Sequence, residues 1–281
     1  MKKWFKFFIS FILIIMGIIL YARFIGTMGF STKEYTIYNN KLPNGFDGIK
    51  VVHFSDIHYG RAINNSKIDK IVDEINLINP DIVIFTGDLI DKDADLNNSH
   101  YDYLTKAFSK INSRYGKYAV LGNHDYKNKD SVIDIYNNSD FIYLENSYDI
   151  IYNQNMEKIF IGGIGNVSYN SDNIEKTMEY FKENEDIDYK IILTHEPDIT
   201  DNIVNNYNVS LILAGHSHNG QIRLPKIGAL ITPMHAKKYY DEYYNVNDTD
   251  IYISSGIGVS TVNFRLFNRP SINFYRINKK R

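Results

Sequence analysis

Five short runs of β-branched and apolar residues in this chain each end in a polar motif that could bind a metal. Strand ends that carry carboxylate, imidazole and amide groups supply the ligands that a pair of divalent metal ions requires. In open α/β sheets, ligands bind outside the carboxyl ends of the strands. The motifs are Asp56-Ile57-His58, Gly87-Asp88, Gly122-Asn123-His124-Asp125, the single His195, and Gly215-His216-Ser217-His218.

The first half of the chain alternates between strand patterns and helix patterns. Such alternation is typical of an α/β fold with a parallel sheet. Apolar residues at helical spacing follow Ser66, which we expect to cap the first of these helices. The expected strands are 34–39, 49–54, 81–85 and 118–121, and the expected helices are 66–78 and 101–111.

The second half has more hairpin character. Two apolar runs separated by polar residues, 150–152 and 159–161, are expected to pair antiparallel. No Pro/Ser/Gly-rich linker and no internal repeat divides the chain, so we expect one domain over residues 35–281. The remaining elements are a helix at 174–181 and strands at 189–193, 209–213, 251–254 and 272–277, the last two completing the sheet.

The N-terminus is expected to be a membrane anchor over residues 1–30. Residues 7–22 carry no charge, and the apolar run continues past Arg23 to Ile25, close to the roughly 20 residues of a membrane-spanning helix. A secretory signal peptide would share this pattern, but no small-residue cleavage site follows. Three preceding lysines favour a cytoplasmic N-terminus. We therefore expect a single-pass protein of the cell membrane with an extracytoplasmic catalytic domain.

Composition narrows the function classes. The net charge is −2 and the isoelectric point about 6.4, which gives no basic surface for long nucleic acids. The chain has no cysteine, so disulfides and thiolate metal sites are excluded. Hydrophobic residues make up 44% of the 281 positions, enough for a sizeable core. The sequence carries no signal for oligomeric state.

The ordered motifs resemble those of the calcineurin-like metallophosphoesterase superfamily. The stretch from Gly215 to Pro225, with Gly256, Gly258 and Arg265, resembles the membrane-anchored bacterial branch of that superfamily. The resemblance covers about residues 48–275. It implies a four-layer α/β/β/α sandwich preceded by one N-terminal transmembrane helix. Two departures from the branch pattern, Asn219 in place of Gly and Ser271 in place of Glu, concern substrate preference rather than the metals.

The resemblance also implies a role for each motif residue. His124 would protonate the leaving oxygen, and Asp91 would orient His124, with Asp125 as the alternative orienting group. Because the ligand set mixes oxygen and nitrogen without sulfur, two Mn, Fe or Zn ions would suit it. The implied ligands are Asp56, His58 and His218 for the first metal, Asp88 with one carboxylate oxygen for each metal, and Asn123, His195 and His216 for the second metal.

These roles predict a phosphoesterase that cleaves phosphodiester or pyrophosphate bonds with a water molecule activated by two metals. The anchor favours a substrate at the membrane or wall, such as a phospholipid, a lipid-linked sugar phosphate or a teichoic-acid-like polymer. An exported nucleotidase or nuclease is the alternative enzyme. A non-catalytic binding module is a third hypothesis, which the complete residue set, including His124, disfavours.

Several other residues could have either a structural or a functional role. His53 is expected in the core rather than as a ligand, His100 in solvent, and His235 either in a loop or near the substrate. Arg223 and Arg265 could hold a second phosphate or form structural salt bridges. The tyrosines at 239, 240, 243 and 244 could line a groove or simply pack together.

Overall fold

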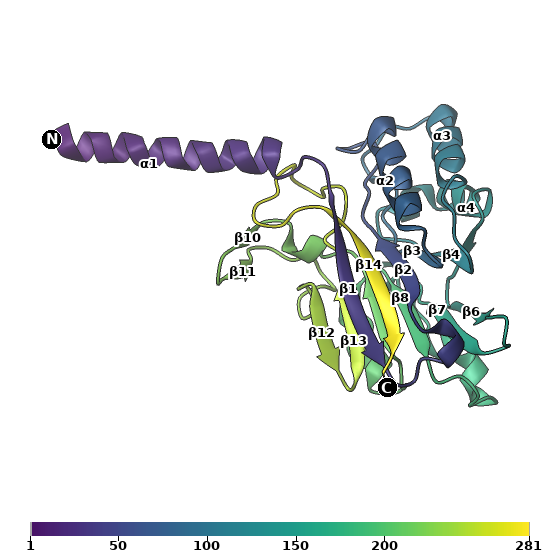
Figure 1. Ribbon diagram of the computed structural model, residues 1–281. Helices are drawn as coiled ribbons and strands as arrows, with labels where there is room; N and C mark the ends of the chain where they lie inside the picture. Colours follow the sequence, from purple (N-terminus) through teal and green to yellow (C-terminus); the bar gives the residue numbers. More distant parts are fainter. Residues whose placement is uncertain (1, 281) are drawn as a thin grey trace.

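A computed structural model describes residues 2–280 of the chain (Figure 1). Two six-stranded sheets lie face to face, and helices cover the outer face of each. One long helix projects away from this body. The arrangement is the four-layer α/β/β/α sandwich with one N-terminal helix that the sequence predicted.

The first sheet has the strand order β1-β14-β2-β3-β4-β5. Strands β2 to β5 are parallel, β14 runs antiparallel to β2, and β1 is parallel to β14 at the edge. The bounds are β1 Ser31–Asn39, β2 Ile49–Phe54, β3 Ile82–Phe85, β4 Gly116–Ala119, β5 Phe141–Tyr143 and β14 Ser271–Lys279.

The second sheet has the order β12-β13-β9-β8-β7-β6. Its four central strands are parallel, and both edge strands are antiparallel to their neighbours. A separate two-stranded ribbon joins β10 and β11. The bounds are β6 Ser147–Tyr152, β7 Lys158–Gly163, β8 Lys190–Thr194, β9 Leu211–Ala214, β10 Arg223–Leu224, β11 Gly228–Ala229, β12 Tyr243–Val246 and β13 Thr249–Ile253.

Of the three helices predicted in the domain, 66–78 corresponds to α2, and 101–111 corresponds to α3, which begins and ends three residues earlier. Asn64 rather than Ser66 caps α2, because its side chain accepts from the Lys67 amide. His100 is half-buried rather than in solvent, since its ring accepts from the Asn97 amide at the start of α3. The predicted helix 174–181 breaks after Thr177. The bounds are α1 Lys2–Leu20, α2 Asn65–Ile78, α3 Asn98–Phe108, α4 Lys129–Asn137, α5 Ile174–Thr177 and α6 Thr200–Val204.

Three buried clusters fill the three gaps between the four layers. Because the central strands are apolar on both faces, alternate residues serve different clusters. Val52 and Val83 face α2 to α4, whereas Val51 and Ile82 face the second sheet. A third cluster joins the outer face of the second sheet to α6 and to Met178 beyond α5. This rigid double sheet positions every loop at its carboxyl edge.

The expectation that residues 251–254 and 272–277 complete a single sheet was wrong. The first segment is β13 of the second sheet, and the second is β14 of the first sheet. Both are apolar on two faces, so the residue pattern alone could not assign them to different layers. The short β5 and the helix α4 before it were not predicted at all.

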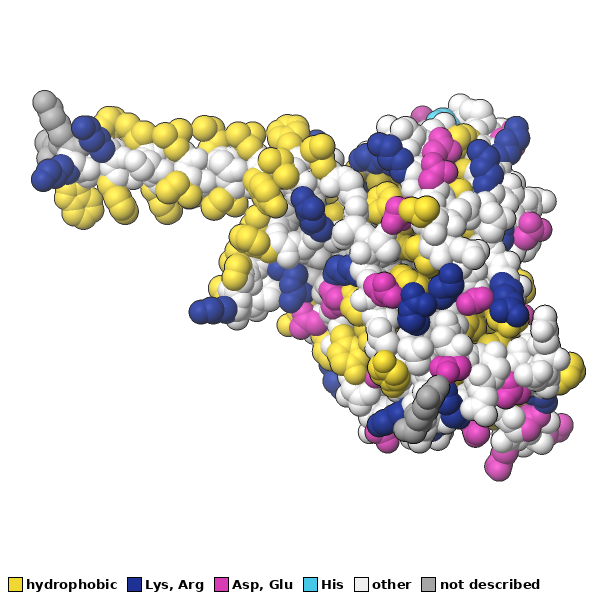
Figure 2. Space-filling model, viewed as in Figure 1, with side chains coloured by type: hydrophobic (Ala, Val, Ile, Leu, Met, Phe, Trp, Pro, Cys, Tyr) yellow, Lys and Arg dark blue, Asp and Glu magenta, His cyan; other side chains and the backbone are white. Residues whose placement is uncertain are grey.

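The N-terminal segment is helical throughout the apolar run. Residues Lys3–Ile25 form, within residues 2–280, the one helix that is long and apolar enough to cross a membrane. Its last turn, Tyr21–Ile25, widens into a π-helix. Nearly all of its large apolar side chains are exposed, which is unlike a core helix of a soluble protein (Figure 2). These features indicate a membrane anchor.

His53 lies on β2 in the core, as expected, and has no solvent exposure. Its Nε2 lies 2.8 Å from the Thr86 hydroxyl and its Nδ1 lies 3.4 Å from the Tyr275 hydroxyl. No charged partner compensates for burial, which lowers the pKa of His53 to about 3.

This burial predicts an acid-sensitive contribution to stability. An unfolded histidine titrates near 6.5, so the unfolded state alone takes up this proton as the pH falls from about 6.5 towards 3. Between pH 7 and pH 5 the free energy of unfolding should therefore fall by about 2 kcal/mol on account of His53. Urea unfolding of the full chain in detergent at both pH values measures the loss. His53→Gln should lose less than wild type; equal losses would contradict this assignment.

Candidate metal centre

Five strand ends deliver the predicted site residues to one place between the two sheets. The first sheet supplies the loops after β2, β3 and β4, and the second supplies the loops after β8 and β9. All the predicted positions are buried or nearly so. The residues brought together are Asp56, His58, Asp88, Asp91, Asn123, His124, His195, His216 and His218.

Left-handed backbone conformations aim these side chains. Five of the predicted ligands have a positive φ, between 48° and 65°, a conformation that residues other than glycine rarely adopt. Each such residue costs on the order of 1–3 kcal/mol, and such costs typically collect at functional sites. Asn219, the departure from the branch pattern, also has a positive φ of 51°, which asparagine tolerates better than most residues. The five ligands are Asp56, His58, Asp88, His216 and His218.

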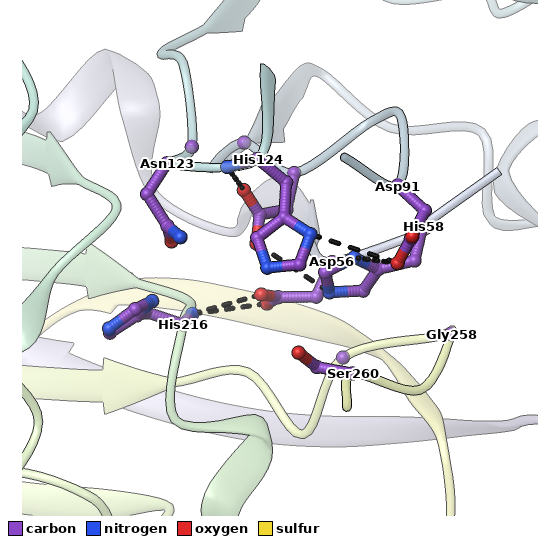
Figure 3. Close-up of polar contacts among 12 residues, drawn as sticks. Asp56, His58, Asp91, Asn123, His124, His216, Gly258 and Ser260 are labelled. Atoms are coloured by element: carbon purple, nitrogen blue, oxygen red, sulfur yellow. Dashed lines mark hydrogen bonds and ion pairs between the residues drawn. The ribbon is translucent and has the colours of Figure 1, made fainter. Parts of the chain in front are cut away.

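The first group of ligands comprises Asp56, His58 and His218. The Nε2 atoms of the two histidines face each other at 3.1 Å, and Asp56 Oδ1 lies 3.4 Å from His218 Nε2. The Asp56 carboxylate also accepts from the His216 amide, at 3.1 Å and 3.2 Å from its two oxygens (Figure 3). This hydrogen bond ties the loop after β9 to the loop after β2.

The second group centres on His195 Nε2. Asn123 Oδ1 and His216 Nδ1 each lie 3.2 Å from this nitrogen, and Asp88 Oδ2 lies 3.4 Å away. Asn123, His216 and Asp88 lie on the loops after β4, β9 and β3, respectively. The group therefore forms only when both sheets are in place.

Asp88 connects the two groups. Its Oδ2 alone faces both, at 3.4 Å from His195 Nε2 and 3.5 Å from His58 Nε2. Its Oδ1 instead accepts from the His124 amide at 2.8 Å. The expectation of one carboxylate oxygen for each metal stays a prediction.

The donor set fits divalent cations. His195 Nδ1 donates to the Thr86 carbonyl at 2.7 Å, and His216 Nε2 donates to the Met234 carbonyl at 2.7 Å. In the neutral rings, the nitrogens that face each other then carry lone pairs rather than protons. Burial lowers the pKa of His195, but the charge of Asp88, its hydrogen bond to the ring and the charges of Asp56 and Glu196 together raise it to about 10. The negative field that favours a proton on His195 Nε2 would equally favour a metal cation, which would take the place of that proton.

His124 and Asp91 lie beside the first group. Asp91 Oδ2 is 3.4 Å from His58 Nδ1 and 3.7 Å from His124 Nδ1, so it faces both rings (Figure 3). Burial lowers the pKa of His124, but the neighbouring carboxylates of Asp91 and Asp88 raise it above its ordinary value. The Lys92 amide also lies 3.4 Å from His124 Nδ1. If Nδ1 accepts from this amide, or if the ring is charged, Nε2 carries a proton.

Asp125 has a different role from the one considered in the sequence. Its carboxylate accepts from the amides of Asp88, Ile90 and Gly122 at 2.8–3.1 Å, and it does not contact the His124 ring. It therefore holds the loops after β3 and β4 together. Asp91, not Asp125, is the carboxylate that faces His124.

Two arginines have structural partners. Arg265 is fully buried and donates to the carbonyls of Gly256 and Gly258, with its Nη2 also 3.2 Å from His218 Nδ1. A role for Arg265 on a second phosphate is therefore wrong. Arg223 pairs with Asp241 at 2.5 Å, which favours the salt-bridge reading.

Sequence reasoning missed Arg61. Its Nη1 lies 3.3 Å from Asp91 Oδ2 and its Nη2 donates to the Thr261 carbonyl at 2.6 Å. No motif pointed to this residue. Tyr239, in contrast, is buried and packs edge-on against Tyr244, which supports ordinary packing for that part of the tyrosine cluster.

A cavity of about 350 Å³ opens onto the centre. The predicted site residues that line the cavity are Asp88, Asn123, His124, His216 and His218. His235 does not line it. The arrangement can hold an anionic group against two adjacent cation sites with a protonated imidazole nearby.

Comparison with known proteins identifies the fold family. The family model described as calcineurin-like phosphoesterase matches residues 49–220, which include every predicted ligand. The chain belongs to this family.

Two relatives of the chain are also named as metallophosphoesterases. The chain is 30% identical over 259 residues to the uncharacterized metallophosphoesterase YkuE of Bacillus subtilis, covering 92% of this chain and 88% of that protein. It is 27% identical over 246 residues to a zebrafish (Danio rerio) transmembrane protein with metallophosphoesterase domain, covering 83% of this chain and 54% of that protein. The solved calcineurin-like phosphoesterase YfkN of B. subtilis aligns with a TM-score of 0.45 and 14% identity, over 74% of this chain and 81% of that one.

In this metallophosphoesterase, Gly122 allows the loops after β3 and β4 to touch. A Cβ at this position would overlap the Asp88 amide nitrogen and Oδ1. We expect Gly122→Ala to displace Asp88 and to lower metal content and activity at least about tenfold. Metal analysis of the purified variant measures this. Gly17→Ala, at an open position in the apolar helix, is the control, and normal metal content in Gly122→Ala would contradict the close-contact argument.

Proposed function

We propose that this chain is a membrane-anchored phosphoesterase that uses two divalent metal ions to cleave phosphodiester or pyrophosphate bonds. The observation that supports it most is the pair of ligand groups that share Asp88 Oδ2, with His124 beside them. In the proposal, His124 and Asp91 serve catalysis, and the metal ligands are Asp56, His58, Asp88, Asn123, His195, His216 and His218.

The ions would neutralise charge on the phosphate and lower the pKa of a water molecule that attacks phosphorus. The residues have separate tasks. His124 holds a proton at Nε2 and gives it to the departing oxygen. Asp91 stabilises the charged form of His124 and faces the ligand His58. The oxygen and nitrogen donors suit Mn, Fe or Zn.

The location of the domain is a further part of the proposal. Lys2, Lys3 and Lys6 precede the apolar run, and short basic flanks favour the cytoplasmic side. The catalytic domain would then lie outside the cytoplasm, where phospholipids, lipid-linked sugar phosphates and wall polymers are accessible. A phosphate of the membrane or the wall is therefore the proposed substrate.

Hydrolysis of two p-nitrophenyl esters tests the reaction class. The full chain in detergent, loaded with Mn, should cleave bis-p-nitrophenyl phosphate faster than p-nitrophenyl phosphate. A chelator should abolish the activity, and added Mn should restore it. Preference for the monoester would contradict the diester assignment. Failure to cleave either ester with two metals bound would contradict the enzyme assignment.

A further inference from the structure

One wall of the metal-centre cavity consists of apolar side chains that the hydrolytic chemistry does not use. It comes from the segment around the β10–β11 ribbon and from the loop 256–268. The wall residues, named here the apolar wall, are Ile222, Leu230, Ile231, Pro233 and Val262.

The apolar wall is unusually exposed for aliphatic residues. Ile231 is 82% exposed, Leu230 52% and Val262 44%. Burial of such side chains is favourable, and contiguous exposed apolar surface commonly marks a binding site. A substrate that carried only polar groups would leave this wall in water.

Hydrogen bonds join the apolar wall to the end of the membrane anchor. The Arg265 amide donates to the Ala22 carbonyl at 2.9 Å, and a Cβ on Gly26 would overlap the Arg265 carbonyl. Gln221 Nε2 donates to the Val262 carbonyl at 2.8 Å. The anchor end, the loop 256–268 and the ribbon therefore form one connected unit.

This unit presents apolar side chains on the side from which α1 leaves the domain. The β10–β11 ribbon projects to that side (Figure 1), and hydrophobic atoms continue from the helix onto the segments below its end (Figure 2). Outside the cavity, Met28, Ile227 and Phe267 are 65–70% exposed. A bilayer crossed by α1 would lie against this side of the domain.

We propose that the cavity takes a phosphate ester with a hydrocarbon chain that comes from the bilayer crossed by α1. The phosphate lies at the metal centre and the chain lies along the apolar wall. This inference rests on the proposed function and narrows its substrate to a lipid ester. The reaction is unchanged: water adds to phosphorus, the bond from phosphorus to the leaving oxygen breaks, and that oxygen receives a proton.

Two esters that differ only in their tails test the inference. The full chain, loaded with Mn in dodecyl maltoside micelles, is given p-nitrophenyl decyl phosphate or p-nitrophenyl methyl phosphate. Both release p-nitrophenol and leave an alkyl phosphate. The decyl ester should have a kcat/KM at least about tenfold higher, because burial of a few methylene groups supplies that factor.

Variants distinguish binding at the apolar wall from partition of the decyl ester into the micelles. That partition is the same for every variant of the protein. Ile231→Ser should reduce the decyl-to-methyl ratio several-fold. Leu77→Ser is the matched control, because Leu77 is an aliphatic residue 80% exposed on α2 and away from the cavity. It should keep the wild-type ratio.

The outcomes distinguish the two proposals. Cleavage of both esters with no tail preference, or an unchanged ratio in Ile231→Ser, would overturn the lipid inference and leave the phosphodiesterase intact. No cleavage of either ester with metals bound would overturn the proposed function, and the inference with it. A tail preference that depends on Ile231 and not on Leu77 supports the apolar wall.

Discussion

Asp88→Asn is expected to reduce the hydrolysis of bis-p-nitrophenyl phosphate more than about 100-fold, since replacing even an indirect partner of a metal ligand costs 10–100-fold. The physical reason is that Asp88 Oδ2 faces both ligand groups at 3.4–3.5 Å. An amide removes the negative charge that both cations would share. We therefore expect the variant to lose metal as well as activity.

Metal analysis and activity together check this expectation. Asp248→Asn is the matched control, because Asp248 is exposed with a φ of 61°, at the opposite end of the second sheet, where asparagine fits equally well. It should keep both metals and full activity. Two tightly bound metals in Asp88→Asn would show that Asp88 does not join the two sites.

His124→Ala should reduce activity by about 10²–10⁴-fold, the usual contribution of a general acid, while both metals remain bound. The backbone amide of His124 donates to Asp88, and the substitution leaves this hydrogen bond in place, while the lost ring only packs edge-on against His58 at 4.5 Å between ring centroids. The loss should also depend on the leaving group. Phenyl esters, whose leaving oxygen is more basic, should lose more activity than p-nitrophenyl esters.

The leaving-group comparison distinguishes proton donation from a structural role. A merely structural defect would lower the hydrolysis of both esters equally. Asp91→Asn should give a smaller loss in the same direction, because Asp91 acts through His124 and His58. Loss of metal in His124→Ala, or equal losses for both esters, would contradict the role as acid.

The sequence predicted the strand ends well because their apolar runs are short and unambiguous. The segment 49–54 is β2 as expected, and each motif follows a strand of a parallel set. The pairing of β14 between β1 and β2 could not be predicted, since long-range pairing leaves no local pattern. The helix cap at Asn64 was missed because Ser66 carries the same local signal.

The metal centre, too, could be predicted only in part from the sequence. The residue types in the motifs predicted which side chains meet, but not their backbone conformations or their supports. Nothing in the residues near Asp125 indicated that it would bind three amides, and Arg61 and Arg265 belong to no ligand motif. These contacts join loops distant in the chain, so they depend on the packing of the two sheets.

The most direct test of the account is the number of metal ions that activity requires. The metal-free full chain in detergent is titrated with Mn while the hydrolysis of bis-p-nitrophenyl phosphate and the bound metal per chain are measured together. The account predicts that activity reaches its maximum only when two ions are bound per chain. Full activity with one ion or none would contradict the binuclear site.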